Sequence, residues 1–162
     1  MTSNSYTFSN LISAHKDKGL ANLKEPFAEI ISVGLKHFSK HKNTIVVNVP
    51  STTFAIQKRG LDPISLMTER ACEMAGRRFI YENNLLLNRS KRQDQAGLNF
   101  RQRKENMHDG FNVGFYTSKP VIIVDDLITT GASLDQSIYS LTKQRIKVKA
   151  CVVIAANILV KP

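Results

Sequence analysis

The chain has 162 residues, of which 42% are apolar and 22% are charged. This is the length of one domain and the composition of an ordinary globular protein, so disorder over most of the chain is excluded. Lys and Arg number 23 against 13 Asp and Glu, a net charge of +10 that favours an anionic partner. We predict one domain, 1–162, with its core at about 20–158.

Two cysteines, Cys72 and Cys151, exclude a disulfide scaffold and form no C-x-x-C metal motif. The first residues lack the basic and apolar regions of a signal peptide, and no apolar run reaches the length of a membrane-spanning helix. We therefore expect a cytoplasmic protein without a membrane span.

The early part of the chain alternates helical and strand patterns. Apolar residues spaced by three and four predict a helix over 20–41. The run TIVVNV at 44–49 predicts a buried strand, and a polar loop follows at 51–60. Asp62 before Pro63 predicts the start of a helix that ends at Gly76, with a weaker strand at 78–81.

A polar stretch then separates this part from the rest of the chain. Residues 85–107 read as a surface excursion, whose basic part spans about 88–107. Between Arg89 and Lys104 there are six cations against one acid, Asp94. Clustered cations attract polyanions, and the composition leaves both nucleic acid and a polyphosphate ligand open.

The last part of the chain predicts a strand, a helix and another strand. The run VIIVD at 121–125 is a second buried strand, a helix follows at about 132–144, and a third strand covers 147–158. This βαβ pattern predicts an α/β fold with a mostly parallel sheet, covered by helices on both faces.

The sharpest chemical signal is VIIVDDLITTGAS at 121–133. Asp125 and Asp126 are expected at the carboxyl end of a strand, where their carboxylates can accept hydrogen bonds from ribose hydroxyls near a bound Mg²⁺. The turn that opens the next helix offers backbone N–H groups and hydroxyls for a monophosphate. Its residues are Thr129, Thr130, Gly131, Ala132 and Ser133.

This stretch resembles the phosphoribosyl-pyrophosphate (PRPP) motif of type I phosphoribosyltransferases. Two other interpretations fail. In a receiver domain, paired acids lie on the first strand and further functional residues follow, whereas here the only later acid is Asp135. A P-loop would need G-x-x-x-x-G-K-[ST], which is missing.

More of the chain, roughly 6–156, resembles the ComF family of phosphoribosyltransferase-like proteins. The matching segments are Leu11–Lys16, Val49-Pro50, Lys58–Asp62, Arg89, Gln95, Gly97-Leu98, Arg103, Asn106 and Gly110-Phe111. The chain departs from the family in lacking its cysteine-rich zinc module, and Leu61-Asp62-Pro63 replaces the usual Phe-Asn-Gln. Thr129 stands where hypoxanthine-guanine-type enzymes have an Asp, which argues against a 6-oxopurine acceptor.

The resemblance implies a type I phosphoribosyltransferase fold, with a parallel sheet of about five strands and a reduced hood. It also implies a catalytic group of Asp125, Asp126 and Arg59. Backbone N–H groups after Pro50, with Ser51, Thr52 and Arg59, can hold pyrophosphate together with Mg²⁺. The basic excursion resembles the family's mobile loop, which closes over the site. Its candidate residues are Arg89, Lys91, Gln95 and Arg103.

Two functions stay open at this point. The first is Mg²⁺-dependent transfer of phosphoribose from PRPP to an unknown acceptor. The second, which the ComF resemblance implies, is a non-catalytic accessory of natural competence that handles imported single-stranded DNA with recombination proteins. Homodimers are common among such proteins, and the sequence does not fix the oligomeric state.

Overall fold

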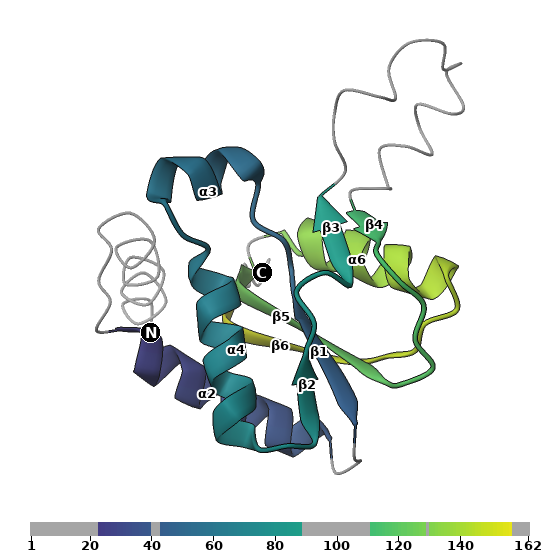
Figure 1. The fold of residues 1–162 in the computed structure, drawn as a ribbon, viewed down its shortest axis with the longest axis horizontal. Coiled ribbons are helices and arrows are strands. Elements are labelled where there is room, and N and C mark those ends of the chain that lie inside the picture. Colours follow the sequence, from purple (N-terminus) through teal and green to yellow (C-terminus); the bar gives the residue numbers. More distant parts are fainter. Residues whose placement is uncertain (1–22, 40–42, 89–110, 129, 157–162) are drawn as a thin grey trace, which may run out of the picture.

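The computed structural model describes residues 23–39, 43–88, 111–128 and 130–156. Helices lie beside the strands of a central sheet (Figure 1). None of the described helices is long and apolar enough to cross a membrane. In chain order the elements are α2 (Lys24–Phe38), β1 (Thr44–Asn48), α3 (Thr53–Arg59), α4 (Pro63–Ala75), β2 (Phe79–Tyr81), β3 (Leu86–Asn88), β4 (Phe111–Val113), β5 (Val121–Ile128), α6 (Ala132–Lys143) and β6 (Val148–Ala156).

The central sheet has the strand order β2-β1-β5-β6, and all three pairings are parallel. β3 and β4 form a separate antiparallel pair. The predicted α/β class with a mostly parallel sheet is therefore confirmed. The number of strands differs from the expectation of about five in one sheet. The described residues form one sheet of four strands and another of two.

Helices cover both faces of the sheet, as predicted. Side chains alternate along each strand, so Val46 and Ile122 face α2 and α4, while Val47 and Ile123 face α6. All four are completely buried. This burial on both faces explains why β1 and β5 read as continuous apolar runs.

The segment 51–60 was predicted as a loop, and this prediction is wrong. Residues 53–59 form α3, whose N-cap Thr52 accepts a hydrogen bond from the Ala55 N–H at 3.2 Å. Gly60 ends the helix in the left-handed region at φ +73°. None of its residues is buried, so α3 has no apolar periodicity that would reveal it.

The strand predicted at 121–125 is longer in the structure. β5 continues to Ile128, and its last residues pair with β6 through Leu127–Ala155 and Ile128–Ala156. Asp125 and Asp126 therefore lie within the strand, not at its last residue. Pairing with β6 outweighs the low strand propensity of two aspartates.

Gly34 allows α2 to approach β6 closely. A Cβ atom at this position would lie 2.7 Å from Cγ1 of Val152. We expect Gly34→Ala to lower the free energy of unfolding by about 1–3 kcal/mol, because overpacking outweighs the roughly 1 kcal/mol gain in helix propensity. Urea unfolding measures the change. Gly34→Ala in a Val152→Ala background should cost less, and a stabilising Gly34→Ala would contradict this packing.

Candidate active site

The strand order places a switch point between β1 and β5. From β1 the chain crosses through α4 to β2 on one side, and from β5 it crosses through α6 to β6 on the other side. The two crossover helices cover opposite faces. In open α/β sheets, ligands bind outside the carboxyl ends of the strands at such a point.

The connection after β1 begins beside Asp125, a residue inside β5. The last backbone hydrogen bond between β1 and β5 runs from the Val49 N–H to the Val124 carbonyl at 2.9 Å. The next residues along each chain are Pro50 and Asp125. The predicted pyrophosphate loop therefore begins beside Asp125 of the predicted phosphoribose motif, at the carboxyl edge of the sheet.

A small pocket lies between the end of β5 and the start of α6. Gly131, at φ +79°, is the N-cap residue of α6. Thr130 Oγ1 accepts a long hydrogen bond, 3.4 Å, from the Ala132 N–H. A helix start leaves its first N–H groups without intrahelical acceptors, which suits a phosphate. The lining residues are Asp125, Leu127, Ile128, Thr130, Gly131, Ala132, Ser133 and Leu134.

The structure separates the two aspartates of the motif. Asp125 is half-buried and lines the pocket, whereas Asp126 is 4% exposed and does not line it. Successive side chains of a strand point to opposite faces, so Asp125 lies on the α6 face and Asp126 on the face of α2 and α4. The Asp126 N–H donates to Asp125 Oδ1 at 2.9 Å, which restrains the Asp125 carboxylate.

Cys151 supports this placement of Asp125. It lies on β6 opposite Ile123 and belongs to the core beneath α6. Burial raises the pKa of the Cys151 thiol, and the nearby carboxylates of Asp125 and Asp135 raise it further. Asp125 is therefore close to the same face that carries the start of α6.

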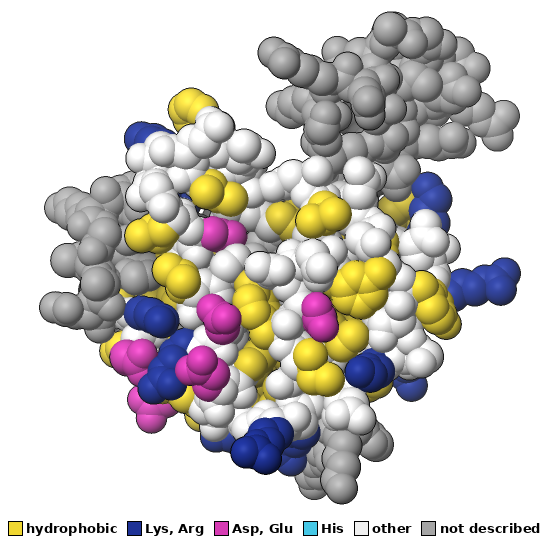
Figure 2. All heavy atoms as spheres, viewed as in Figure 1, with side chains coloured by type: hydrophobic (Ala, Val, Ile, Leu, Met, Phe, Trp, Pro, Cys, Tyr) yellow, Lys and Arg dark blue, Asp and Glu magenta, His cyan; other side chains and the backbone are white. Residues whose placement is uncertain are grey.

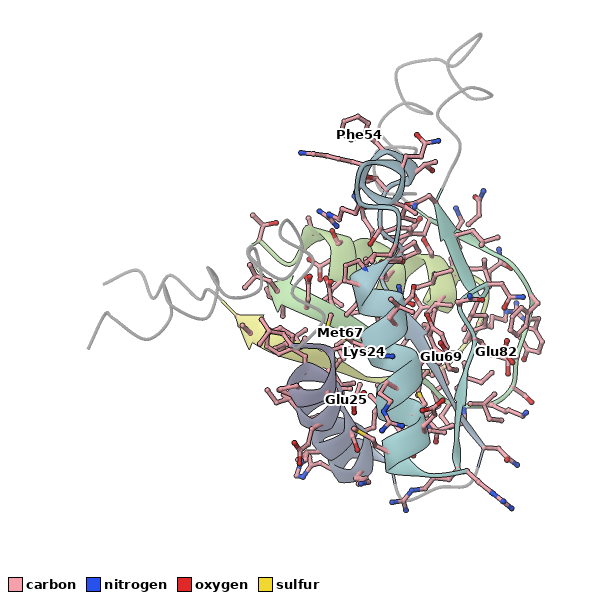
Figure 3. The ribbon with its side chains drawn as sticks, turned by 60° about the vertical axis from the view of Figure 1, so that its left-hand side comes forward. Lys24, Glu25, Phe54, Met67, Glu69 and Glu82 are labelled. Atoms are coloured by element: carbon pink, nitrogen blue, oxygen red, sulfur yellow. The ribbon has the colours of Figure 1, made fainter. Side chains whose placement is uncertain are left out.

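The residues predicted to hold pyrophosphate lie around α3, at the same edge. Ser51 Oγ donates to Asp62 Oδ1 at 2.7 Å, Thr52 caps α3, and Arg59 is the half-buried last residue of that helix. Figure 3 shows α3 at the outer end of the protein, with Phe54 pointing away from it. Arg59 thus reaches this edge from a helix, not from an extended loop.

A hydrogen-bonded network that the sequence did not reveal fixes this connection. Asp62 precedes α4 as predicted, but its side chain caps no backbone N–H. It accepts from the hydroxyls of Ser51 and Ser65, each at 2.7 Å. Tyr81 donates to Asn48 Oδ1 at 2.7 Å, and Ser65 Oγ lies 3.3 Å from the same atom. The network therefore joins β1, the loop after it, α4 and β2.

Asn88 at the end of β3 adds one more contact, because its side-chain amide donates to the Ser51 carbonyl. Asn88 also pairs with Phe111, so the described residues on either side of 89–110 lie next to each other. The excursion's own candidates, Arg89, Lys91, Gln95 and Arg103, lie outside the described residues, as does Thr129. Their predicted roles stay predictions.

The donor set suits a magnesium ion that arrives with its ligand. Within the described ranges, no group of three or more His, Cys, Asp or Glu side chains is placed to hold a metal alone. Mg²⁺ commonly keeps several waters and binds through one or two carboxylates plus substrate phosphates. Asp125, half-exposed at the pocket, fits this arrangement, with pyrophosphate oxygens as further ligands.

Comparison with known proteins gives likenesses of structure but none of sequence. No family model matches the chain, and no curated protein matches its sequence. The structure is similar to a crystal structure of a hypoxanthine phosphoribosyltransferase from Staphylococcus aureus, with a TM-score of 0.46 and 12% sequence identity. The match covers 82% of this chain and 61% of that chain, so this chain spans less than two thirds of its neighbour's length. A likeness at this level assigns no substrate.

The Asp62 network makes a prediction about the loop after β1. Asp62→Ala removes the carboxylate that accepts from the hydroxyls of Ser51 and Ser65. We therefore expect the free energy of unfolding to fall by about 1–2 kcal/mol. Backbone amides of α3 should also exchange with solvent faster, because the loop is no longer tied to α4. Urea unfolding and hydrogen exchange measure these changes.

The matched control is Glu69→Ala, which removes an exposed acid from α4 (Figure 3). It should shift stability by no more than about 0.5 kcal/mol. Equal effects of the two substitutions would contradict a specific role for Asp62.

Tyr81 predicts a loss of stability at high pH. Burial raises its pKa to about 12, with a smaller opposing effect from its hydrogen bond to Ser65. The unfolded chain loses this proton near pH 10, so the contribution to stability is complete below that value and is lost as the pH rises toward 12.

Urea unfolding over this pH range tests the prediction. Cys72, whose pKa burial also raises to about 12, acts in the same direction, so the comparison must be with Tyr81→Phe. The stability of this variant should decline less between about pH 10 and 12. An identical decline would show that Tyr81 titrates normally.

Proposed function

We propose that this chain binds PRPP at the carboxyl edge of its sheet and acts as a phosphoribosyltransferase of the ComF type. One observation carries the proposal: Asp125 and the turn Thr130–Ser133 line the same pocket, at the switch point between β1 and β5. A carboxylate and a row of helix-start N–H groups are the partners that a ribose 5-phosphate needs at its two ends.

In this proposal, the turn before α6 and the loop after β1 bind different parts of PRPP. The turn before α6 would hold the 5-phosphate, and Asp125 would accept hydrogen bonds from the ribose hydroxyls. Pyrophosphate would lie toward the loop after β1, because this loop begins at Pro50, beside Asp125. Arg59 supplies a cation there, and guanidinium groups bind phosphate oxygens in pairs.

Transfer would break the bond between C1 of the ribose and pyrophosphate, and form a bond from C1 to the acceptor. The electron pair of the broken bond stays on pyrophosphate, so negative charge increases on this leaving group. Mg²⁺, when bound, neutralises that charge. Asp126, buried beneath the site, would position Asp125 through the hydrogen bond from its backbone N–H.

The acceptor is the finer part of the proposal. Residue 129 is Thr, where hypoxanthine-guanine-type enzymes have Asp, so we propose an acceptor other than a 6-oxopurine. The ComF resemblance also implies a role in competence, which the basic stretch 88–107 favours, but the cations of this stretch lie outside the described residues. No observation at this site favours it.

Calorimetric titration with PRPP tests the proposal. We expect saturable binding that requires Mg²⁺, and at least about tenfold weaker binding for Asp125→Asn, because it loses a charge-assisted hydrogen bond. Pyrophosphate release in the presence of candidate acceptors would then test the transfer step.

Asp135→Asn is the matched control for Asp125→Asn. It removes the same charge from the exposed side of α6's first turn, outside the pocket lining. Its affinity for PRPP should stay within about threefold of the wild type. Absence of binding at millimolar PRPP, or equal affinities of Asp125→Asn and the wild type, would contradict the proposed site.

A further inference from the structure

Ser51, in the loop after β1, is held through both its side chain and its backbone. Its hydroxyl donates to Asp62 Oδ1 at 2.7 Å, and its carbonyl accepts from the side-chain amide of Asn88. Asp62 directly precedes α4, whereas Asn88 is the last residue of β3. Because α4 and β3 pack against opposite faces of the sheet, Ser51 is held from both sides.

The hydroxyl of Ser51 has no second hydrogen to offer a ligand. A serine hydroxyl carries one hydrogen, and here the Asp62 carboxylate accepts it. An anion at this loop would therefore be bound by backbone N–H groups. The direction of each peptide group then decides whether the loop attracts or repels that anion, because the carbonyl oxygen carries partial negative charge.

Asn88 fixes the direction of the peptide group between Ser51 and Thr52. The C=O and N–H of a trans peptide point in opposite directions, and no peptide bond among the described residues is cis. With the Ser51 carbonyl held toward Asn88, the Thr52 N–H points away from β3. Rotation of this peptide group would put a carbonyl oxygen where the N–H now lies, and this oxygen would repel pyrophosphate.

The position of Asn88 in β3 turns its side chain toward the protein. In the antiparallel pair of β3 and β4, Asn88 lies opposite Phe111. Phe111 packs with Leu86 in the core beneath α6, so the face that both share with Asn88 is the inner one. The next pair, Leu87 and Asn112, is exposed on the outer face.

The strand pair that carries Asn88 is itself anchored to α6. Ser140 Oγ donates to the Phe111 carbonyl at 3.1 Å, and Figure 1 shows β3 and β4 beside α6. Neither strand contains Lys or Arg, and Figure 2 shows uncharged side chains over β3. A neutral amide therefore holds the Ser51 carbonyl, and an uncharged replacement of Asn88 leaves the charge around the loop unchanged.

We propose that Asn88 is a positioning residue for pyrophosphate, which acts on the ligand through the peptide group between Ser51 and Thr52. The inference rests on the proposed PRPP site and concerns its pyrophosphate end alone. PRPP and ribose 5-phosphate share the phosphate that the turn before α6 would hold, whereas only PRPP extends to the loop after β1. Loss of the Asn88 amide should thus weaken the binding of PRPP and spare that of ribose 5-phosphate.

Calorimetric titration with PRPP and with ribose 5-phosphate, both in the presence of Mg²⁺, tests the proposal. Asn88→Leu keeps the approximate shape of the side chain and its lack of charge, but removes the donor. The Kd of PRPP should rise at least about tenfold, because the hydrogen bond from the Thr52 N–H to the charged pyrophosphate is lost. The Kd of ribose 5-phosphate should stay within about threefold of the wild type.

Asn88→Ala is a second variant, which places no new apolar bulk beside the loop and should change the ratio of the two Kd values in the same direction. A second readout follows the peptide group itself in ¹⁵N-labelled protein. Addition of PRPP should shift the amide signal of Thr52 in the wild type, and shift it less in Asn88→Leu. A loss of stability alone would change neither the ratio nor this difference.

Asn112→Leu is the matched control, because it makes the same replacement on the neighbouring strand but on the exposed outer face. Both of its Kd values should stay within about threefold of the wild type.

Three results would overturn this inference and leave the proposed function intact. They are an unchanged ratio of the two Kd values in both Asn88 variants, an equal change of the ratio in Asn112→Leu, or a wild type that binds PRPP no more tightly than ribose 5-phosphate. Equal loss of both ligands in the Asn88 variants would also overturn it, because Asn88 would then support the fold alone. Failure of the wild type to bind either ligand would contradict the PRPP site itself, and this inference with it.

Discussion

The hydrogen bond from the Val49 N–H to the Val124 carbonyl, at 2.9 Å, is the last link between β1 and β5. Beyond it the chain leaves β1 for α3 and then α4 on one face, while β5 continues to Ile128 and then leads to α6 on the other face. The start of the loop after β1 and the turn before α6 lie at one sheet edge only because β1 and β5 are neighbours in parallel register. The position of the candidate site thus depends on strand order more than on any single side chain. The buried apolar residues of β1 and β5 fix this order.

The parts of this arrangement that the sequence predicts are those with a local pattern. β1 and β5 are buried on both faces, so they appear as unbroken apolar runs, and the motif at 121–133 puts Asp125 and Thr130–Ser133 in one short stretch. α3 has no buried face, and its only local signals are the caps at Thr52 and Gly60. The Asp62 network is not local, since Tyr81 and Asn48 are 33 residues apart. No periodicity or motif records such a contact, which forms only when the sheet assembles.

The strands carry opposite charges at their two ends. Around the carboxyl edge, Asp125 lines one pocket with the first residues of α6, and Asp62 accepts from the hydroxyls of Ser51 and Ser65. At the amino edge, where the strands begin, the segments 76–78, 117–120 and 144–147 contain Lys and Arg but no Asp or Glu. A polyanion without a metal is attracted to the second edge and repelled from the acids of the first.

We propose that Asp125 and the turn before α6 form one site that binds ribose 5-phosphate. The most direct measurement is a nuclear magnetic resonance titration of the ¹⁵N-labelled protein with ribose 5-phosphate, which lacks the pyrophosphate and so reports on this pocket alone. We expect saturable chemical-shift changes for the backbone amides of Asp125, Gly131, Ala132 and Ser133. The amide signals around Arg77 and Lys147 should stay unchanged. Shifts confined to the amino edge, or no shifts at millimolar ligand, would contradict this proposal.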